Sequence, residues 1–174
     1  EVLGTLAMDQ CVFNISLIPR ESTDPHPHGR EEVEFLISTN PGTPAQPLGK
    51  IASGGELSRI SLAIQVVTAS SGTVPSMVFD EVDVGIGGAV AEVVGKLLRT
   101  LSGQAQVLCV THLPQVAAQG HQHLQVVKTI DGKSVQTSLR LLQGEDKIQE
   151  FARMLGGVTI TAQTLAHARE MLES

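Results

Sequence analysis

The chain has 174 residues, of which 41% are hydrophobic, so it can bury the core of one compact domain and is not an intrinsically disordered chain. Aromatic residues make up only 2%, so the core has to be built from Leu, Val, Ile and Ala. Twelve basic and 18 acidic residues give a net charge of −6, which argues against a surface that binds nucleic acid by bulk positive charge.

Neither a membrane span nor a disulfide framework is expected. No apolar run approaches the roughly 20 residues that a membrane span needs, and no basic-then-apolar leader opens the sequence. The two cysteines, Cys11 and Cys109, lie in apolar runs, which favours reduced and buried thiols. These features together predict a cytoplasmic protein.

Two strands and two loops are expected in the first 50 residues. The segments 10–19 and 32–39 are rich in β-forming residues and could pair as an antiparallel ribbon. The segments 21–32 and 40–49 contain several Pro and Gly residues and are expected to be exposed loops.

Helices and strands alternate in the middle of the chain. The apolar spacing predicts a helix over 55–69 and a second helix over 89–102. The short apolar runs 74–81 and 105–112 are typical of fully buried strands of a parallel sheet. This alternation predicts an α/β fold with parallel central strands flanked by helices.

The last third should add edge elements. A short helix over 113–120 is followed by a hairpin over 123–142, whose turn is expected around Asp131–Gly132. Two helices, 145–155 and 161–173, close the chain. We therefore expect a β-hairpin and antiparallel strands at the edges of the parallel sheet.

Polar side chains stand at the carboxyl ends of the two parallel strands, where α/β sheets gather their chemistry. Asp80 there suits the ligand shell of Mg²⁺, and the adjacent Glu81 suits the polarisation of a water nucleophile. His112, at the tip of the next strand, could bond a phosphate or orient that water. Each residue alone is equally compatible with a solvated or satisfied side chain at a strand end.

The motif SGGE, residues 53–56, precedes the first long helix. Glycines allow backbone N–H groups to face an anion, and the helix N-terminus adds unsatisfied donors. Ser53 can also be an ordinary helix N-cap, so the motif alone leaves both interpretations open.

The order and spacing of these motifs resemble the second half of an ABC-type ATPase head. The resemblance implies a signature loop at Ser53, Gly54, Gly55 and Glu56, a Walker B strand at Met77–Asp80, a catalytic glutamate at Glu81, a D-loop aspartate at Asp83 and a switch histidine at His112. In such heads the signature loop caps ATP bound to the opposite protomer. The resemblance therefore implies ATP and Mg²⁺ as cofactors, with Asp80 at the metal, and an ATP-dependent homodimer of heads.

Longer runs narrow the resemblance to the SMC-like branch of these ATPases. FLISTNPGTPAQPLGKIASGGELSRISLAIQVV (35–67), FDEVDVGIGG (79–88), VTHLPQVAAQGHQH (110–123) and the closing MLGG tail are similar to SMC-like ATPases of bacterial DNA repair. The similarity extends over 1–174 and implies a nucleoid-associated protein that acts on DNA in recombinational repair of double-strand breaks. The head of another SMC-like ATPase is the alternative within this branch.

The sequence contains no P-loop of the form G-x-x-x-x-G-K-[ST], and the nearest stretch, 42–51, has the wrong spacing. The long coiled coil of the family is absent too. We therefore expect residues 1–174 to form one half-domain of a head whose amino-terminal half carries the P-loop. Two function classes follow: part of an ATP hydrolase that is inactive alone, or a folded interaction module without nucleotide activity.

The sequence gives weaker support to other kinds of functional site. A zinc site around Cys109, His112, His121 and His123 lacks any C-x-x-C motif and is discounted. His26 and His28 lie in a Pro-rich loop and are expected to be solvated.

A hydrolase triad of Ser58, Asp80 and His112 lacks the G-x-S-x-G elbow and is discounted as well. Arg59 could reach a phosphate, cap a dimer interface or form a surface salt bridge, and the sequence does not decide. Gln115 could lie near the γ-phosphate through His112 or be solvated at a helix start.

Overall fold

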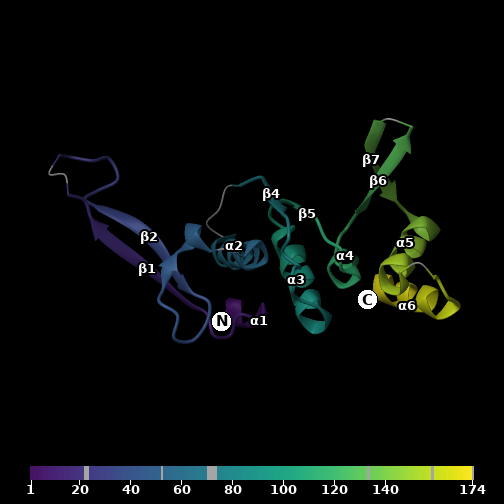
Figure 1. Ribbon diagram of the computed structural model, residues 1–174, viewed down its shortest axis with the longest axis horizontal. Helices are drawn as coiled ribbons and strands as arrows, with labels where there is room; N and C mark the ends of the chain where they lie inside the picture. Colours follow the sequence, from purple (N-terminus) through teal and green to yellow (C-terminus); the bar gives the residue numbers. More distant parts are fainter. Residues whose placement is uncertain (22–23, 52, 70–73, 133, 158, 174) are drawn as a thin grey trace.

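The computed structural model describes residues 1–21, 24–51, 53–69, 74–132, 134–157 and 159–173. The described elements are α1 (Val2–Thr5), β1 (Val12–Pro19), β2 (Glu31–Ser38), β3 (Gln46–Pro47), η1 (Leu48–Lys50), α2 (Gly54–Thr68), β4 (Ser76–Phe79), α3 (Gly88–Leu101), β5 (Gln106–Cys109), α4 (Pro114–Ala118), β6 (His123–Asp131), β7 (Ser134–Leu142), α5 (Gly144–Gly156) and α6 (Ala162–Glu173). They form an elongated chain of small units, with β1–β2 at one end and α5–α6 at the other (Figure 1).

The predicted antiparallel ribbon is confirmed: β1 and β2 pair from Val12↔Ser38 to Pro19↔Glu31. The segment 40–49 is not only loop, because β3 adds a short third strand beside β2 and η1 follows it. Elements this short contain no repeating hydrophobic pattern. The sequence therefore had no signal for β3, η1 or α1.

The centre of the molecule is a β4–α3–β5 unit. The two strands are parallel, as predicted, with Met77 opposite Val107 and Phe79 opposite Cys109. Helices α2 and α3 pack together over an aliphatic core. That core includes Leu62, Ala63, Phe79, Val82, Ala91, Val94, Leu98 and Leu101. All of these side chains except Phe79 are aliphatic, as the low aromatic content leads one to expect.

The prediction that β4 and β5 are fully buried is wrong. Val78 is 70% exposed and Leu108, its partner across the ladder, is 43% exposed. The helices cover only the face that carries Phe79 and Cys109, so the opposite face lies open in this chain. Parallel sheets are normally covered on both faces. Cys11 and Cys109 are free, as expected, but only half-buried.

The carboxyl-terminal third matches the predicted elements closely. β6 and β7 form the hairpin, and Gly132 takes the left-handed backbone, φ 55°, that the turn requires. Asp131 still pairs with Ser134, so the turn lies beyond Asp131 rather than around it. Helices α5 and α6 pack on a small core of their own, built on Phe151, Ala152 and Ala168.

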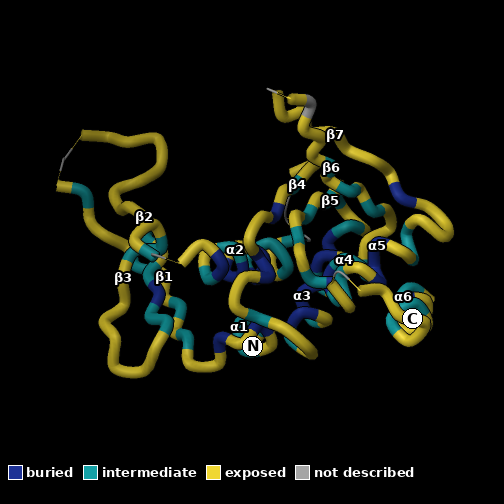
Figure 2. The backbone as a smooth tube through the Cα atoms, turned by 45° about the vertical axis from the view of Figure 1, so that its right-hand side comes forward, coloured by how far each residue is buried: buried dark blue, intermediate teal, exposed yellow. Residues whose placement is uncertain are grey.

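Each of the three described sheets carries exposed apolar side chains on one face. Buried residues are most frequent from α2 to α5 (Figure 2). We call the three exposed apolar faces the uncovered faces. They consist of Ile15, Leu17, Val33 and Phe35 on β1–β2, Val78, Leu108 and Val110 along β4–β5, and Leu124, Val126, Ile130, Val135, Leu139 and Leu141 on β6–β7. Among the helices that the structure describes, none is long and apolar enough to cross a bilayer.

Candidate nucleotide-binding site

The polar ends of β4 and β5 lie side by side, as the parallel pairing requires. The amide of Val110 donates to the Phe79 carbonyl at 2.9 Å, so the ladder continues to the last residues before both polar segments. Asp80 to Asp83 follow one strand, and Thr111 and His112 follow the other. The structure therefore brings together the two segments that the sequence singled out.

Asp83 is the centre of this group. Its side chain is only 2% exposed, and its Oδ2 accepts hydrogen bonds from the Thr111 hydroxyl at 2.5 Å and the His112 amide at 3.0 Å. The His112 Nδ1 atom lies 3.2 Å from the same oxygen, while the His112 side chain is 69% exposed. Asp83 thus contacts the Nδ1 edge of an imidazole that is otherwise largely exposed.

The expected contact of Asp83 with ATP stays a prediction. In this chain the Asp83 carboxylate is buried, and its Oδ2 accepts from Thr111 and His112. The sequence pointed to His112 but not to Thr111 as a partner in the group. The signal was present, because Thr111 stands at the same strand end.

Glu81 has an unusual backbone. Its φ is 58°, in the left-handed region that non-glycine residues rarely adopt and that costs on the order of 1–3 kcal/mol. The Glu81 amide donates to Asp80 Oδ1 at 2.9 Å, and the Glu81 carbonyl accepts from the Val84 amide at 3.1 Å. These bonds hold the turn in place and keep the Glu81 side chain at the surface.

The SGGE segment lies against the same turn. Ser53 is the N-cap of α2, and its hydroxyl oxygen accepts from the Glu56 amide at 3.3 Å, so the N-cap interpretation is confirmed. A Cβ added to Gly54 would overlap the Glu81 carboxylate, and one added to Gly55 would lie 2.9 Å from the Val84 carbonyl oxygen. Packing against backbone therefore requires Gly55, whereas the exposed Glu81 side chain could move away from a Cβ at Gly54.

Two side chains of α2 bond the backbone of this turn. The Ser58 hydroxyl donates to the backbone carbonyl of Asp80 at 2.6 Å. The hydroxyl that a hydrolase triad would need as its nucleophile is therefore already engaged. Arg59 is buried and donates from Nη1 to the Val84 carbonyl at 2.7 Å, so it is not a surface salt bridge. The first turns of α2 and the Asp80–Val84 segment form one packed unit.

Asp80 is the residue of this group that we expect at a metal. No cluster of three or more His, Cys, Asp or Glu side chains that could hold a metal occurs among the residues described. Burial and the nearby Asp83 and Asp80 raise the pKa of Cys109 to about 12, which disfavours the thiolate that zinc binds. The exposed Asp80 fits Mg²⁺, which is held by one or two carboxylates together with phosphate oxygens.

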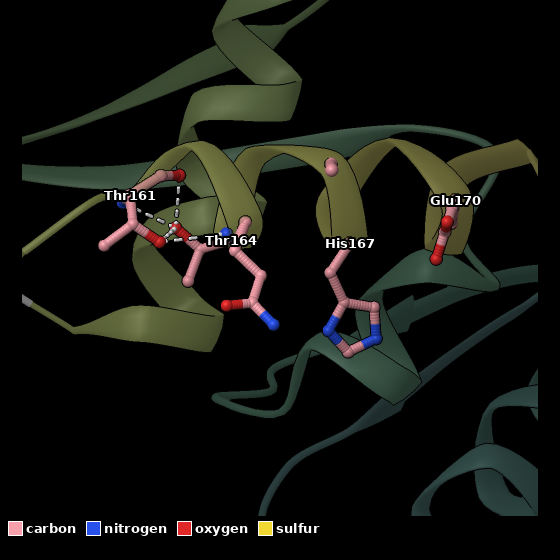
Figure 3. A pocket seen from close by; sticks show the side chains of 6 residues that line it. Thr161, Thr164, His167 and Glu170 are labelled. Atoms are coloured by element: carbon pink, nitrogen blue, oxygen red, sulfur yellow. Dashed lines mark hydrogen bonds between the residues drawn. The ribbon is translucent and has the colours of Figure 1, made fainter.

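A separate hollow of about 430 Å³ lies along α6, where Thr161, Thr164, His167 and Glu170 share one face (Figure 3). The Thr161 and Thr164 hydroxyls each accept the other residue's backbone amide, at 3.2 and 2.8 Å, and so begin the helix. Gln115 lines a neighbouring hollow together with His167. Both roles that the sequence left open for Gln115 stay predictions.

Comparison with known proteins identifies the chain. No protein-family model matches it. The "DNA repair protein RecN" of Xylella fastidiosa (strain 9a5c) is 58% identical over 99% of the chain, and that of Vibrio cholerae is 54% identical over 96%. This chain is a segment of the RecN family. It spans about a third of these relatives' length, 31% and 30% respectively.

Solved structures agree with this assignment at the level of the fold. The Smc head domain of Pyrococcus yayanosii matches 86% of the RecN-family segment and 26% of its own chain, with a TM-score of 0.59 and 17% identity. A structure from work on ATP-driven dimerization and DNA-stimulated activation of SMC ATPases matches 91% of the segment and 89% of its own chain, with a TM-score of 0.51 and 16% identity. The predicted α/β fold of an SMC-like head is confirmed.

Proposed function

We propose that this segment is the carboxyl-terminal half of an ATP-hydrolysing head, within a RecN-type protein that repairs DNA double-strand breaks by recombination in bacterial cells. The observation that carries the proposal is the packed unit of Glu81, Asp83, His112 and the SGGE segment. The fold and the RecN similarity support it, and DNA and the nucleoid would be reached through the longer protein.

Each residue of the site has a role in ATP hydrolysis that follows from its position. Glu81 stands at the surface and polarises the attacking water. His112 presents Nε2 to the γ-phosphate, while Asp83 holds Nδ1 and fixes the orientation of the ring. Asp80 binds Mg²⁺, which when bound neutralises phosphate charge. The ATP of a second head is faced by the SGGE segment, which consists of Ser53, Gly54, Gly55 and Glu56. The backbone amides at the N-terminus of α2 bind the phosphate of that ATP.

The uncovered faces support the idea that another part of the same protein packs against this chain. They carry 13 apolar side chains in three patches, each on one face of a sheet. Because the RecN relatives are about three times as long as this chain, the rest of the protein has enough length to cover these faces. We propose that the amino-terminal half with the P-loop docks there and completes the head.

The role of Glu81 is tested by Glu81→Gln in the longer protein. We expect ATP hydrolysis to fall by at least about a hundredfold while ATP-bound dimers accumulate, because Gln occupies the same space but cannot accept a proton. Steady-state turnover and light scattering with ATP measure the two effects. Glu92→Gln is the matched control, since Glu92 lies on the outer surface of α3, paired with Lys96 at 2.6 Å. Normal hydrolysis by Glu81→Gln would remove the proposed role.

The competing interaction-module function is tested by mixing. We expect this chain alone to be inactive and its mixture with the amino-terminal half to hydrolyse ATP, because the two halves share the site. Activity of the chain alone would show that it binds nucleotide without a P-loop. A folded, bound but inactive mixture would favour the interaction module.

A further inference from the structure

Arg59 has the most unusual environment of the charged residues in the site. It is 7% exposed, and its Nη1 donates to the carbonyl of Val84, which lies 25 residues further along the chain. Its Nε is buried without a hydrogen-bond partner, and within the described part of the chain no carboxylate forms an ion pair with it. A buried guanidinium with a single bond is costly, so its position needs an explanation.

The surroundings of Arg59 are shaped to keep this bond. Gly55 has no side chain, and a Cβ there would lie 3.2 Å from Arg59 Nη1 and 2.9 Å from the Val84 oxygen. One turn of α2 thus makes room for the guanidinium and for the carbonyl that it binds. Ser58, the preceding residue, bonds the Asp80 carbonyl at 2.6 Å. The two adjacent side chains therefore hold both ends of the Asp80–Val84 segment.

We propose that Arg59 is a positioning residue that couples the SGGE segment to Glu81 through the Val84 carbonyl. The inference rests on the proposed function. In a pair of heads, the SGGE segment contacts the nucleotide of the second head, whereas Glu81 and His112 act on the nucleotide of their own. The Arg59–Val84 bond then joins the two nucleotide sites of the assembly inside one chain.

This role differs from a contact with phosphate or with the second head. Both of those need the guanidinium at the surface, and here it is covered by the turn that it binds. A positioning role predicts lost turnover with retained nucleotide-driven association. A phosphate or interface contact predicts lost association.

The test is Arg59→Lys in the longer protein, because Lys keeps the charge but lacks the planar fork that reaches Val84. We expect kcat to fall about tenfold or more, with KM for ATP and ATP-driven dimerisation unchanged. Arg99→Lys is the matched control: Arg99 also donates from a helix to a backbone carbonyl, that of Gln119 at 2.9 Å, but is exposed and remote from Glu81.

Two results would overturn the coupling. The first is a folded Arg59→Lys protein whose kcat stays within about twofold of the unaltered protein. The second is a variant that no longer dimerises with ATP. If Arg59→Lys does not fold, Gly55→Ala decides, because its methyl group would lie 2.9 Å from the Val84 oxygen and 3.2 Å from Arg59 Nη1. We expect it to lower kcat while ATP-driven dimerisation is kept; an unchanged kcat or lost dimerisation would overturn the proposal. Activity of Glu81→Gln, in contrast, would remove the proposed function itself.

Discussion

At the residue scale, the candidate site depends on one nearly buried carboxylate, that of Asp83. Asp83 accepts bonds from a hydroxyl and an amide and lies against an imidazole, all at one buried oxygen. Burying a carboxylate costs free energy unless it is hydrogen-bonded, and its hydrogen bonds fix the orientation of the groups that donate to it. His112 therefore has one preferred orientation, although most of its ring is in solvent.

This arrangement gives a testable expectation for Asp83→Asn. The amide keeps the shape but removes the negative charge and points a donor toward Thr111 or His112. We expect the free energy of unfolding to fall by about 1–3 kcal/mol. Hydrolysis by the longer protein should fall as well, because the His112 ring loses its fixed orientation. Denaturant titration and steady-state turnover measure the two effects.

The control for Asp83→Asn is Asp146→Asn. Asp146 pairs with Arg140 at 3.1 Å, and both side chains are more than half exposed, so its loss should change stability by less than about 1 kcal/mol. Equal stability and turnover in the two variants would contradict a special role for Asp83.

At the element scale, the β6–β7 hairpin is fastened to α5 by a mixed polar and aromatic junction. Glu150 is buried and accepts from Gln125 of β6 at 2.7 Å and from Arg153 at 2.7 and 2.8 Å. Those hydrogen bonds from Arg153 lower the pKa of Glu150. His123 stacks edge-on against Phe151, with ring centroids 5.1 Å apart. The junction sets the direction in which the hairpin leaves the helices.

His123 makes this junction sensitive to pH. Burial lowers its pKa below the model-peptide value of 6.5, with Glu150 opposing and Lys147 adding to the shift. The unfolded chain therefore binds the proton more readily than the folded chain. We expect the contribution of His123 to stability to be complete above pH 6.5 and to be lost as the pH falls from 6.5 through the lower folded-state pKa.

The measurement is the denaturation midpoint as a function of pH for His123→Gln and for His121→Gln. His121 precedes the hairpin and is exposed, which makes it the control. The His123 variant should lose part of the slope below pH 6.5, whereas the His121 variant should keep it. Parallel curves for the unaltered chain and the His123 variant would show that the junction does not sense pH.

At the scale of the whole molecule, the chain is an open row of units rather than a closed globule (Figures 1 and 2). The uncovered faces are larger and more continuous than the scattered apolar residues of an ordinary surface. The face on β6–β7 illustrates this, because Val126 and Leu139 are directly opposite each other and are 58% and 66% exposed. A monomer with such faces should self-associate.

The double substitution Val126→Lys, Leu139→Glu tests this expectation. Opposite charges across the ladder keep the hairpin paired but make its face polar. We expect the chain alone to self-associate less and to bind less of a hydrophobic dye, and the same change to prevent docking of the amino-terminal half. Light scattering and co-purification measure these effects. Thr129→Lys with Gln136→Glu, an exposed pair on the opposite face, is the control pair. Docking that survives the first pair would place the amino-terminal half elsewhere.

Much of the fold could be predicted because its elements are defined by local patterns. The repeating apolar positions of α2 and α3, the apolar runs of β4 and β5, and the turn at Gly132 depend only on neighbours in the chain. The Ser53 cap and the polar strand ends at Asp80 and His112 follow from the same patterns, so the candidate site could be located from sequence.

The burial of particular side chains was decided by tertiary structure alone. Burial depends on which faces of distant elements meet, and no local pattern records that. Asp83 turned inward because Thr111 and His112 end the neighbouring strand, and Arg59 was enclosed because Gly55 lets α2 approach Val84. Val78 and Leu108 stayed exposed because both helices pack on the other face of their sheet. The sequence by itself determined the elements and the chemistry at their ends, whereas the contacts between distant elements decided which of those groups lie at the surface and which hold them in place.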